Sequence, residues 1–160
     1  MAKTRMTDHI VIRKAASDDH PFIFSLSPLL ANEAKLPWHN ETTMQKMQDV
    51  YIAEMLNNTE QPQLTLIAEI NNEAVGFIHA CSHHDSISGE LCATIPLLAV
   101  SKSFNRCGVG SALMNAAEEW AKTQGYRLMH LEVFANNNKA QKFYKNNGFN
   151  PETLHMVKTL

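Results

Sequence analysis

The segment from Leu98 to Leu113 constrains the fold more than any other part of this sequence. An apolar strand ending at Val100 is followed by a polar loop, and the loop ends in Gly108 and Gly110, where a helix opens. Glycine lets a backbone approach a ligand closely, and the first N–H groups of a helix carry the positive end of its dipole. The segment therefore predicts a cradle for a diphosphate, with Arg106 beside it as a charge partner.

Two common phosphate-binding motifs do not fit this segment. A P-loop requires GxxxxGK[ST], and the sequence contains no such string. A dinucleotide-binding turn requires GxGxxG directly after its strand, but Leu113 takes the place of the third glycine. Residues 101–107 also separate Val100 from Gly108. A dinucleotide-binding oxidoreductase is therefore the least favoured interpretation.

The pattern of apolar residues predicts an alternating order of strands and helices. Period-two alternation predicts strands over 9–15, 64–70, 74–82, 90–100 and 127–135, and one last strand within 149–160. Helical spacing predicts helices over 17–30 with a break at Pro28, then over 41–57, 108–124 and 139–147. Ser17 and Asp18 are the expected N-cap residues of the first helix. The predicted order is β-α-α-β-β-β-α-β-α-β in a single domain.

A second motif lies downstream, Asn137-x-x-Ala140-x-x-Phe143-Tyr144-x-x-x-Gly148-Phe149. It resembles the NxxAxxxYxxxGF segment of the GNAT N-acetyltransferase superfamily. The glycine loop resembles that superfamily's [Q/R]-x-x-G-x-[G/A] signature, except that Asn105 replaces the usual Gln or Arg. The resemblance spans residues 9–160 and implies an α/β fold with a mixed sheet, in which the fourth and fifth strands splay apart.

The resemblance implies acetyl-CoA as a co-substrate and assigns its contacts. The pantetheine arm is expected to lie in the opening between the splayed strands, along Leu98, Ala99 and Val100. Pro96 is tolerable there only at a bulge, because proline cannot donate a ladder hydrogen bond. Asn137 is expected to contact the cofactor arm. The diphosphate is expected on the main-chain N–H groups of Asn105, Arg106, Cys107, Gly108, Val109, Gly110 and Ser111.

The implied reaction moves an acetyl group from the thioester to a primary amine. Tyr144 matches the family tyrosine that donates a proton to the leaving thiolate. Glu90, at the start of the fourth strand, is the preferred carboxylate for the general base. The other candidates for the base are His79, His130, Glu132 and Glu33. No acceptor is specified, although a small amine or an amino-acid-like molecule is preferred for a chain of this length.

Composition narrows the setting of the protein. A net charge of −2 excludes a polybasic nucleic-acid binder, and no apolar run approaches the length of a membrane span. Three cysteines without a CxxC pair suggest free thiols in the cytoplasm. The His83-His84-Asp85 run is expected to be an exposed turn, so no metal is predicted. The resemblance also allows a homodimer through the tail, Thr153–Leu160, and allows a catalytically silent acyl-CoA-binding module as the alternative function.

Overall fold

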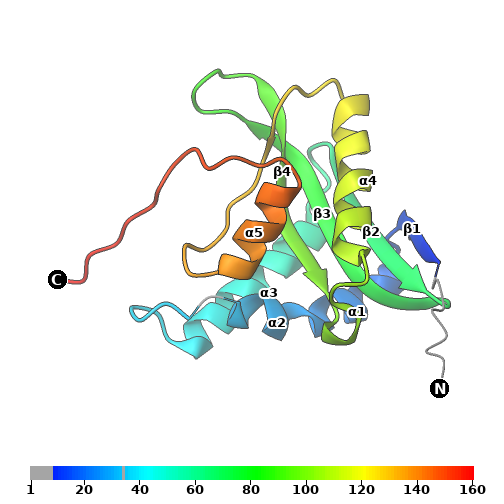
Figure 1. The fold of residues 1–160 in the computed structure, drawn as a ribbon, viewed down its shortest axis with the longest axis horizontal. Helices are drawn as coiled ribbons and strands as arrows, with labels where there is room; N and C mark the ends of the chain where they lie inside the picture. Colours follow the sequence, from blue (N-terminus) through cyan, green and yellow to red (C-terminus); the bar gives the residue numbers. More distant parts are fainter. Residues whose placement is uncertain (1–8, 34) are drawn as a thin grey trace.

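The computed structural model describes residues 9–33 and 35–160, which form a mixed five-stranded sheet flanked by helices (Figure 1). The strands lie in the order β1 to β5, and the first three pairings are antiparallel whereas β4 and β5 are parallel. The α/β fold with a mixed sheet is as predicted. The strands are β1 (Ile10–Lys14), β2 (Gln63–Ile70), β3 (Glu73–His84), β4 (Leu91–Val100) and β5 (Met129–His130).

The helices agree closely with the helical spacing of the sequence. They are α1 (His20–Ser25), α2 (Ser27–Asn32), α3 (Glu41–Asn57), α4 (Val109–Thr123) and α5 (Asn138–Asn146), with short 3-10 turns at Ser17–Asp19 and Lys102–Phe104. The predicted break falls at Leu26, because Pro28 occupies the first turn of α2, where a missing N–H costs nothing. No helix within the described ranges has both the length and the apolar character to cross a bilayer.

The predicted N-cap of the first helix is wrong. Asp19 is the N-cap residue of α1 and makes no side-chain capping bond to that helix. Its side chain instead accepts a 2.7 Å hydrogen bond from the backbone N–H of Ala16, the N-cap of the preceding 3-10 turn. Ser17 and Asp18 are exposed and do not cap. Asp19 is drawn inward because its carboxylate also binds Arg13 of β1.

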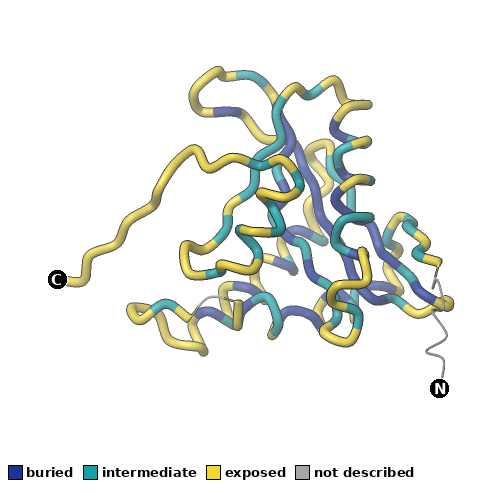
Figure 2. Tube along the Cα trace, viewed as in Figure 1, coloured by how far each residue is buried: buried dark blue, intermediate teal, exposed yellow. Residues whose placement is uncertain are grey.

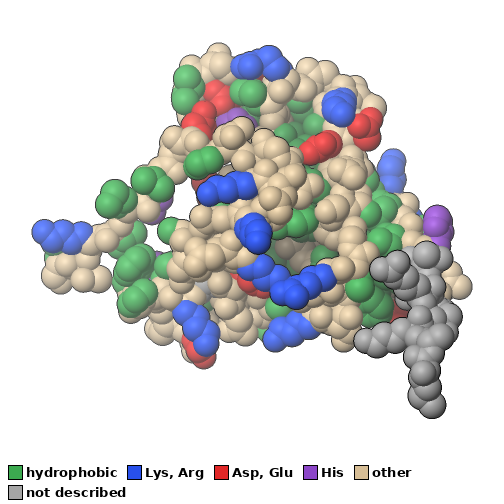
Figure 3. All heavy atoms as spheres, viewed as in Figure 1, with side chains coloured by type: hydrophobic (Ala, Val, Ile, Leu, Met, Phe, Trp, Pro, Cys, Tyr) green, Lys and Arg blue, Asp and Glu red, His purple; other side chains and the backbone are tan. Residues whose placement is uncertain are grey.

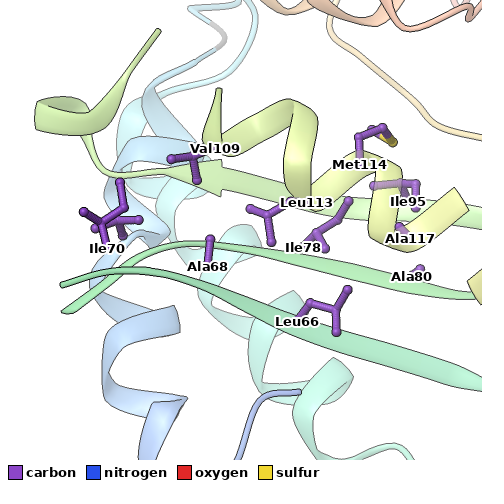
Figure 4. Packing of buried hydrophobic residues seen from close by; sticks show 11 residues of the cluster. Leu66, Ala68, Ile70, Ile78, Ala80, Ile95, Val109, Leu113, Met114 and Ala117 are labelled. Atoms are coloured by element: carbon purple, nitrogen blue, oxygen red, sulfur yellow. The ribbon is translucent and has the colours of Figure 1, made fainter. Parts of the chain in front are cut away.

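The sheet carries a hydrophobic core on each of its faces. On one face α4 packs Val109, Leu113 and Met114 against β2, β3 and β4 (Figure 4). On the other face α1 and α3 cover Phe77 and Leu97. The residue pattern of β3 explains the two cores, because neighbouring side chains of a strand point to opposite faces, as Phe77 and Ile78 do.

β4 and β5 diverge after two paired residues. Ala93 pairs with Met129 and Thr94 with His130, while β4 continues to Val100 alongside β3. One extra residue of β4 lies between Thr94 and Leu97, where the register with β3 shifts. This bulge contains Pro96, and it lets Ile95 and Leu98 face the same core. The expected splay and the expected bulge are both confirmed.

The predicted last strand is wrong. Residues 149–160 form no strand, and the chain leaves the body of the protein as an exposed extension (Figures 1 and 2). The strand predicted over 127–135 is also reduced, to Met129–His130. β4 pairs with β5 only through Ala93 and Thr94, so residues 131–135 gain no ladder from β4. Residues 149–160 pair with no described strand.

Candidate active site

The loop before α4 presents free backbone N–H groups at its tip. Gly108 is the N-cap of α4 with φ 84°, and Arg106 is also left-handed, with φ 65°. Ala112 is the first helical residue whose N–H is bonded, to the Gly108 carbonyl at 3.0 Å. Among the described residues none accepts from the N–H groups of Val109, Gly110 or Ser111. Left-handed residues followed by a helix start are typical of anion-binding concavities, and this loop has that backbone geometry.

Gly108 and Gly110 are required for different structural reasons. Gly108 is needed for its positive φ, which disfavours a side chain. A Cβ on Gly110 would lie 3.3 Å from Cζ of Phe143 in α5, which is tighter than ordinary contact. Gly110 therefore lets α5 pack against the first turn of α4, and this packing brings α5 to the edge of the cradle.

Leu98, Ala99 and Val100 line the open side of the divergence. Each pairs with β3, through Ile78, Phe77 and Gly76 respectively. On the opposite edge β5 has already ended, so among the described residues no strand pairs with this part of β4. An extended substrate arm can occupy such an edge through main-chain hydrogen bonds.

Asn137 and Tyr144 are positioned by α5, and Tyr144 packs against the core that includes Leu98 and Val100. Asn137 is the N-cap of α5, accepting from the Ala140 N–H at 3.1 Å, and its amide nitrogen donates to Glu33 at 3.3 Å. Tyr144 is partly buried between Phe143 and Phe149, with ring centroids 5.5 and 5.9 Å away. Burial, with a smaller contribution from the Glu33 carboxylate, raises the pKa of Tyr144 to about 12. The phenol therefore keeps its proton at neutral pH and can act as a proton donor.

Glu90, the base preferred from the sequence, directly precedes β4 and is held in an ion pair. Its carboxylate is bound by Arg127 and accepts from the Ser88 hydroxyl at 2.9 Å. The hydrogen bond from Arg127 is the main reason that the pKa of Glu90 lies below its usual value, which weakens it as a base. Glu90 precedes Leu98 by eight positions, about 26 Å of extended strand.

The remaining candidates for the base occupy separate environments. His79 is buried in β3, with Nδ1 2.8 Å from the Thr65 hydroxyl, and burial lowers its pKa to about 4. Glu33 is held by Asn137. Glu132 follows β5, and its charge reaches Tyr51 of α3. The pKa of Tyr51 is raised chiefly by burial and further by nearby charges, among them that of Glu132. His130 is paired with Asp85, a contact that no sequence motif signalled.

The histidine run and the cysteines behave partly as expected. The predicted turn is wrong for His83 and His84, which are exposed but end β3, paired with Cys92 and Leu91. Asp85 is buried and accepts from the N–H groups of Ile87 and Ser88. Within residues 9–33 and 35–160 no cluster of three or more His, Cys, Asp or Glu side chains could hold a metal. The three cysteines are free thiols, and Cys107 in the cradle loop is the exposed one.

Comparison with known proteins identifies the family of this chain. Residues 28–149 match the model of the acetyltransferase (GNAT) family. The chain belongs to the GNAT acetyltransferase family. An uncharacterised N-acetyltransferase of Methanocaldococcus jannaschii is 35% identical over 100 residues, covering 59% of this chain and 44% of that protein. A mycothiol acetyltransferase of Jonesia denitrificans is 30% identical over 132 residues, covering 81% of this chain and 41% of that protein. This chain thus spans less than half the length of either relative.

Solved structures share the fold of this GNAT chain. An acetyl transferase from Pyrococcus furiosus superposes with a TM-score of 0.78 at 24% identity, covering 95% of this chain and 100% of that one. An aminoglycoside N-acetyltransferase in complex with CoA superposes with a TM-score of 0.69 at 22% identity, covering 94% and 95%. At these identities the likeness supports the fold alone.

Proposed function

We propose that this chain transfers an acetyl group from acetyl-CoA to a primary amine. The observation that carries the proposal is the combination of free N–H groups at the start of α4 with an unpaired edge on the last residues of β4. The first feature suits a diphosphate, and the second suits an amide-bearing arm leading from it. CoA contains both groups, joined in this order.

The electrostatics of the surrounding surface agree with a phosphate-rich substrate. Lys102 and Arg106 belong to the loop before α4, and α5 adds Lys139, Lys142 and Lys145. Figure 3 shows lysine and arginine side chains gathered over this face of the molecule. The chain carries a net charge of −2 overall, so this local concentration of positive charge is a property of the face and not of the composition.

The proposed reaction is direct attack of the amine on the thioester carbonyl. The nitrogen–carbon bond forms, the carbon–sulfur bond breaks, and the thiolate takes its proton from the Tyr144 hydroxyl. The proton lost by the attacking nitrogen returns to the phenolate through water. Burial raises the pKa of this phenol to about 12, so it still carries its proton when the thiolate leaves. A small or amino-acid-like amine is the proposed acceptor, and the free thiols fit the cytoplasm as the setting.

We also propose that residues 9–160 act as one acetyltransferase domain and that two chains form a homodimer through the exposed tail. The GNAT family model covers residues 28–149, and β1 adds its strand to the same sheet. In the tail, Leu154 and Met156 are 84% and 86% exposed, which leaves apolar surface uncovered in a single chain.

The test of the function measures binding and turnover separately. Acetyl-CoA is expected to raise the melting temperature and NAD to leave it unchanged, and free CoA should be released with at least one member of a panel of small amines. Tyr144→Phe should lower turnover about 100-fold with acetyl-CoA affinity unchanged. Stabilisation by NAD alone would refute the proposal, and acetyl-CoA binding without turnover of any amine would indicate a silent binding module.

A further inference from the structure

His130 occupies the point at which β4 and β5 separate. It is the last residue of β5 that pairs with β4, opposite Thr94. Val100, next to the phosphate cradle, lies six residues further along β4, about 20 Å of extended strand. The opening between the two strands therefore has the cradle at its wide end and His130 at its closed end.

The side chain of His130 lies on the face of the sheet opposite α4. Its neighbour Met129 packs against the core beneath α4, and adjacent residues of a strand point to opposite faces. The ring of His83 supports this placement, since its centroid is 5.8 Å from that of His130. Tyr144, in contrast, packs against the α4 side. Tyr144 and His130 therefore lie on opposite faces of the sheet.

Asp85 fixes the protonation pattern of this imidazole. Its Oδ2 lies 3.0 Å from Nε2 of His130, and its Oδ1 accepts from the N–H groups of Ile87 and Ser88 at 2.9 and 2.6 Å. These hydrogen bonds, with the one from the Ser88 backbone foremost, hold the pKa of Asp85 below its ordinary value. A carboxylate can only accept, so Nε2 of the neutral imidazole carries the hydrogen and Nδ1 keeps its lone pair.

The imidazole is also reachable. Asp85 is 4% exposed, but 27% of the His130 side chain is exposed, and within the described ranges no side chain or backbone group hydrogen-bonds to Nδ1. A buried carboxylate behind an accessible imidazole is the arrangement that orients a histidine base in other acyl-transfer sites. The other candidates lack it, because Arg127 holds Glu90, Asn137 holds Glu33 and burial encloses His79.

We propose that His130 is the general base of the acetyl transfer and that Asp85 is its positioning residue, a proposal that rests on the function proposed above. Nδ1 takes one proton from the ammonium group of the acceptor, and the freed nitrogen attacks the thioester carbonyl. The carbon–sulfur bond breaks and the thiolate takes the Tyr144 proton. The second proton of the attacking nitrogen returns to the phenolate through water, and the imidazolium releases its proton to solvent.

The kinetic test compares His130→Gln with wild type and with His83→Gln, which alters the neighbouring exposed ring only. His130→Gln should lower kcat/KM about 100-fold at pH 7 while leaving acetyl-CoA affinity unchanged. The deficit should shrink at pH values where the acceptor amine is already neutral, and it should be smaller for a weakly basic acceptor such as hydroxylamine. Equal activity of His130→Gln and wild type at every pH would overturn the proposal.

Other charged groups near His130 also affect the pH profile. Asp85 and His83 face His130 directly, Glu90 and Arg127 lie beyond Asp85, and Glu132 follows on the same chain segment. Glu90→Gln is therefore the matched variant. It should keep wild-type turnover and the wild-type pH profile if His130 is the base.

A second readout does not depend on finding the acceptor. Nitrogen-15 NMR of histidine-labelled protein should show neutral His130 with the proton on Nε2, and Asp85→Asn should shift the population toward the Nδ1–H form. A wild-type Nδ1–H tautomer would overturn the proposal even if acetyl-CoA turnover is found. Failure of acetyl-CoA to bind would instead refute the proposed function while leaving the tautomer result intact.

Discussion

His79 lies on β3 opposite Leu97, facing the core beneath α1 and α3, and is only 3% exposed. Burial lowers its pKa to about 4, whereas a histidine in an unfolded chain titrates near 6.5. Below pH 6.5 the unfolded chain binds a proton that the folded chain excludes, so stability falls with pH until about pH 4. The expected loss over this window is about 3 kcal/mol.

His79→Gln should remove most of this dependence, because an amide can still bond Thr65 but does not titrate. Urea unfolding at pH 7, 6 and 5 measures the slope of stability against pH. The control is His84→Gln, an exposed position that should keep the wild-type slope. An unchanged slope in His79→Gln would show that another group causes the acid sensitivity.

Asp19 connects β1 to the first helical turn. It binds Arg13 at 2.7 and 2.8 Å and caps the Ala16 N–H, and the hydrogen bonds from Arg13 lower its pKa. Its contribution is therefore fully present above the unfolded pKa of about 3.9 and is lost as pH falls through the lower folded pKa. At pH 7, Asp19→Ala should cost about 2 kcal/mol in the free energy of unfolding.

The neighbouring residue provides the control for this change. Asp18 is exposed and caps nothing, so Asp18→Ala should alter stability by less than about 0.5 kcal/mol. Urea unfolding of both variants at pH 7 gives the comparison. If Asp18→Ala is as destabilising as Asp19→Ala, net charge and not the bond to Arg13 accounts for the loss.

At the scale of elements, Gly76 sets how closely β3, β4 and α4 approach. A Cβ at this position would lie 2.9 Å from the carbonyl oxygen of Ala99 and 3.2 Å from Cγ1 of Val109. The first contact is with backbone, which cannot move without shifting the end of β4. Gly76→Ala should therefore cost about 1–3 kcal/mol and weaken acetyl-CoA binding, since Val100 and Val109 border the cradle.

Thermal unfolding and calorimetric titration with acetyl-CoA test both parts of this expectation. Glu73→Ala, at the exposed start of the same strand, should change neither quantity. Loss of stability without loss of affinity in Gly76→Ala would mean that the cradle is positioned independently of the β3–β4 contact.

Elements that depend on local pattern could be predicted, and those that depend on distant partners could not. The apolar stripe of α4 and the Asn71-Asn72 turn, whose residues both have positive φ, are encoded within a few residues. Residues 127–135 also alternate like a strand, yet only Met129–His130 pairs, because pairing requires β4 to stay alongside.

The features of the candidate site also divide into those encoded by local sequence and those that depend on distant partners. The cradle is local, so Gly108 and its loop could be found from sequence. The Asp85–His130 contact joins a hairpin turn to the end of β5, and Gly76 is constrained by a carbonyl on another strand. Neither contact has a sequence signal, because each arises from sheet register. The same limit applies to the environment of Glu90. Its place next to the start of β4 was predicted, but its ion pair with Arg127 was not.

At the scale of the whole molecule, residues 150–160 form an exposed tail that the rest of the described protein does not cover (Figure 2). Exposed Leu154, Met156 and Leu160 would be buried if a second chain received them, and the proposed homodimer does this. Removing residues 151–160 should therefore convert a dimer to a monomer while leaving the melting temperature of the remaining fold nearly unchanged, because neither core includes the tail. Leu154→Asp with Met156→Asp should act like the deletion, and Glu152→Lys, an exposed tail change without loss of apolar surface, should not. Sedimentation equilibrium at micromolar concentration distinguishes the two states, and a truncated protein that remains dimeric would place the interface elsewhere on the surface.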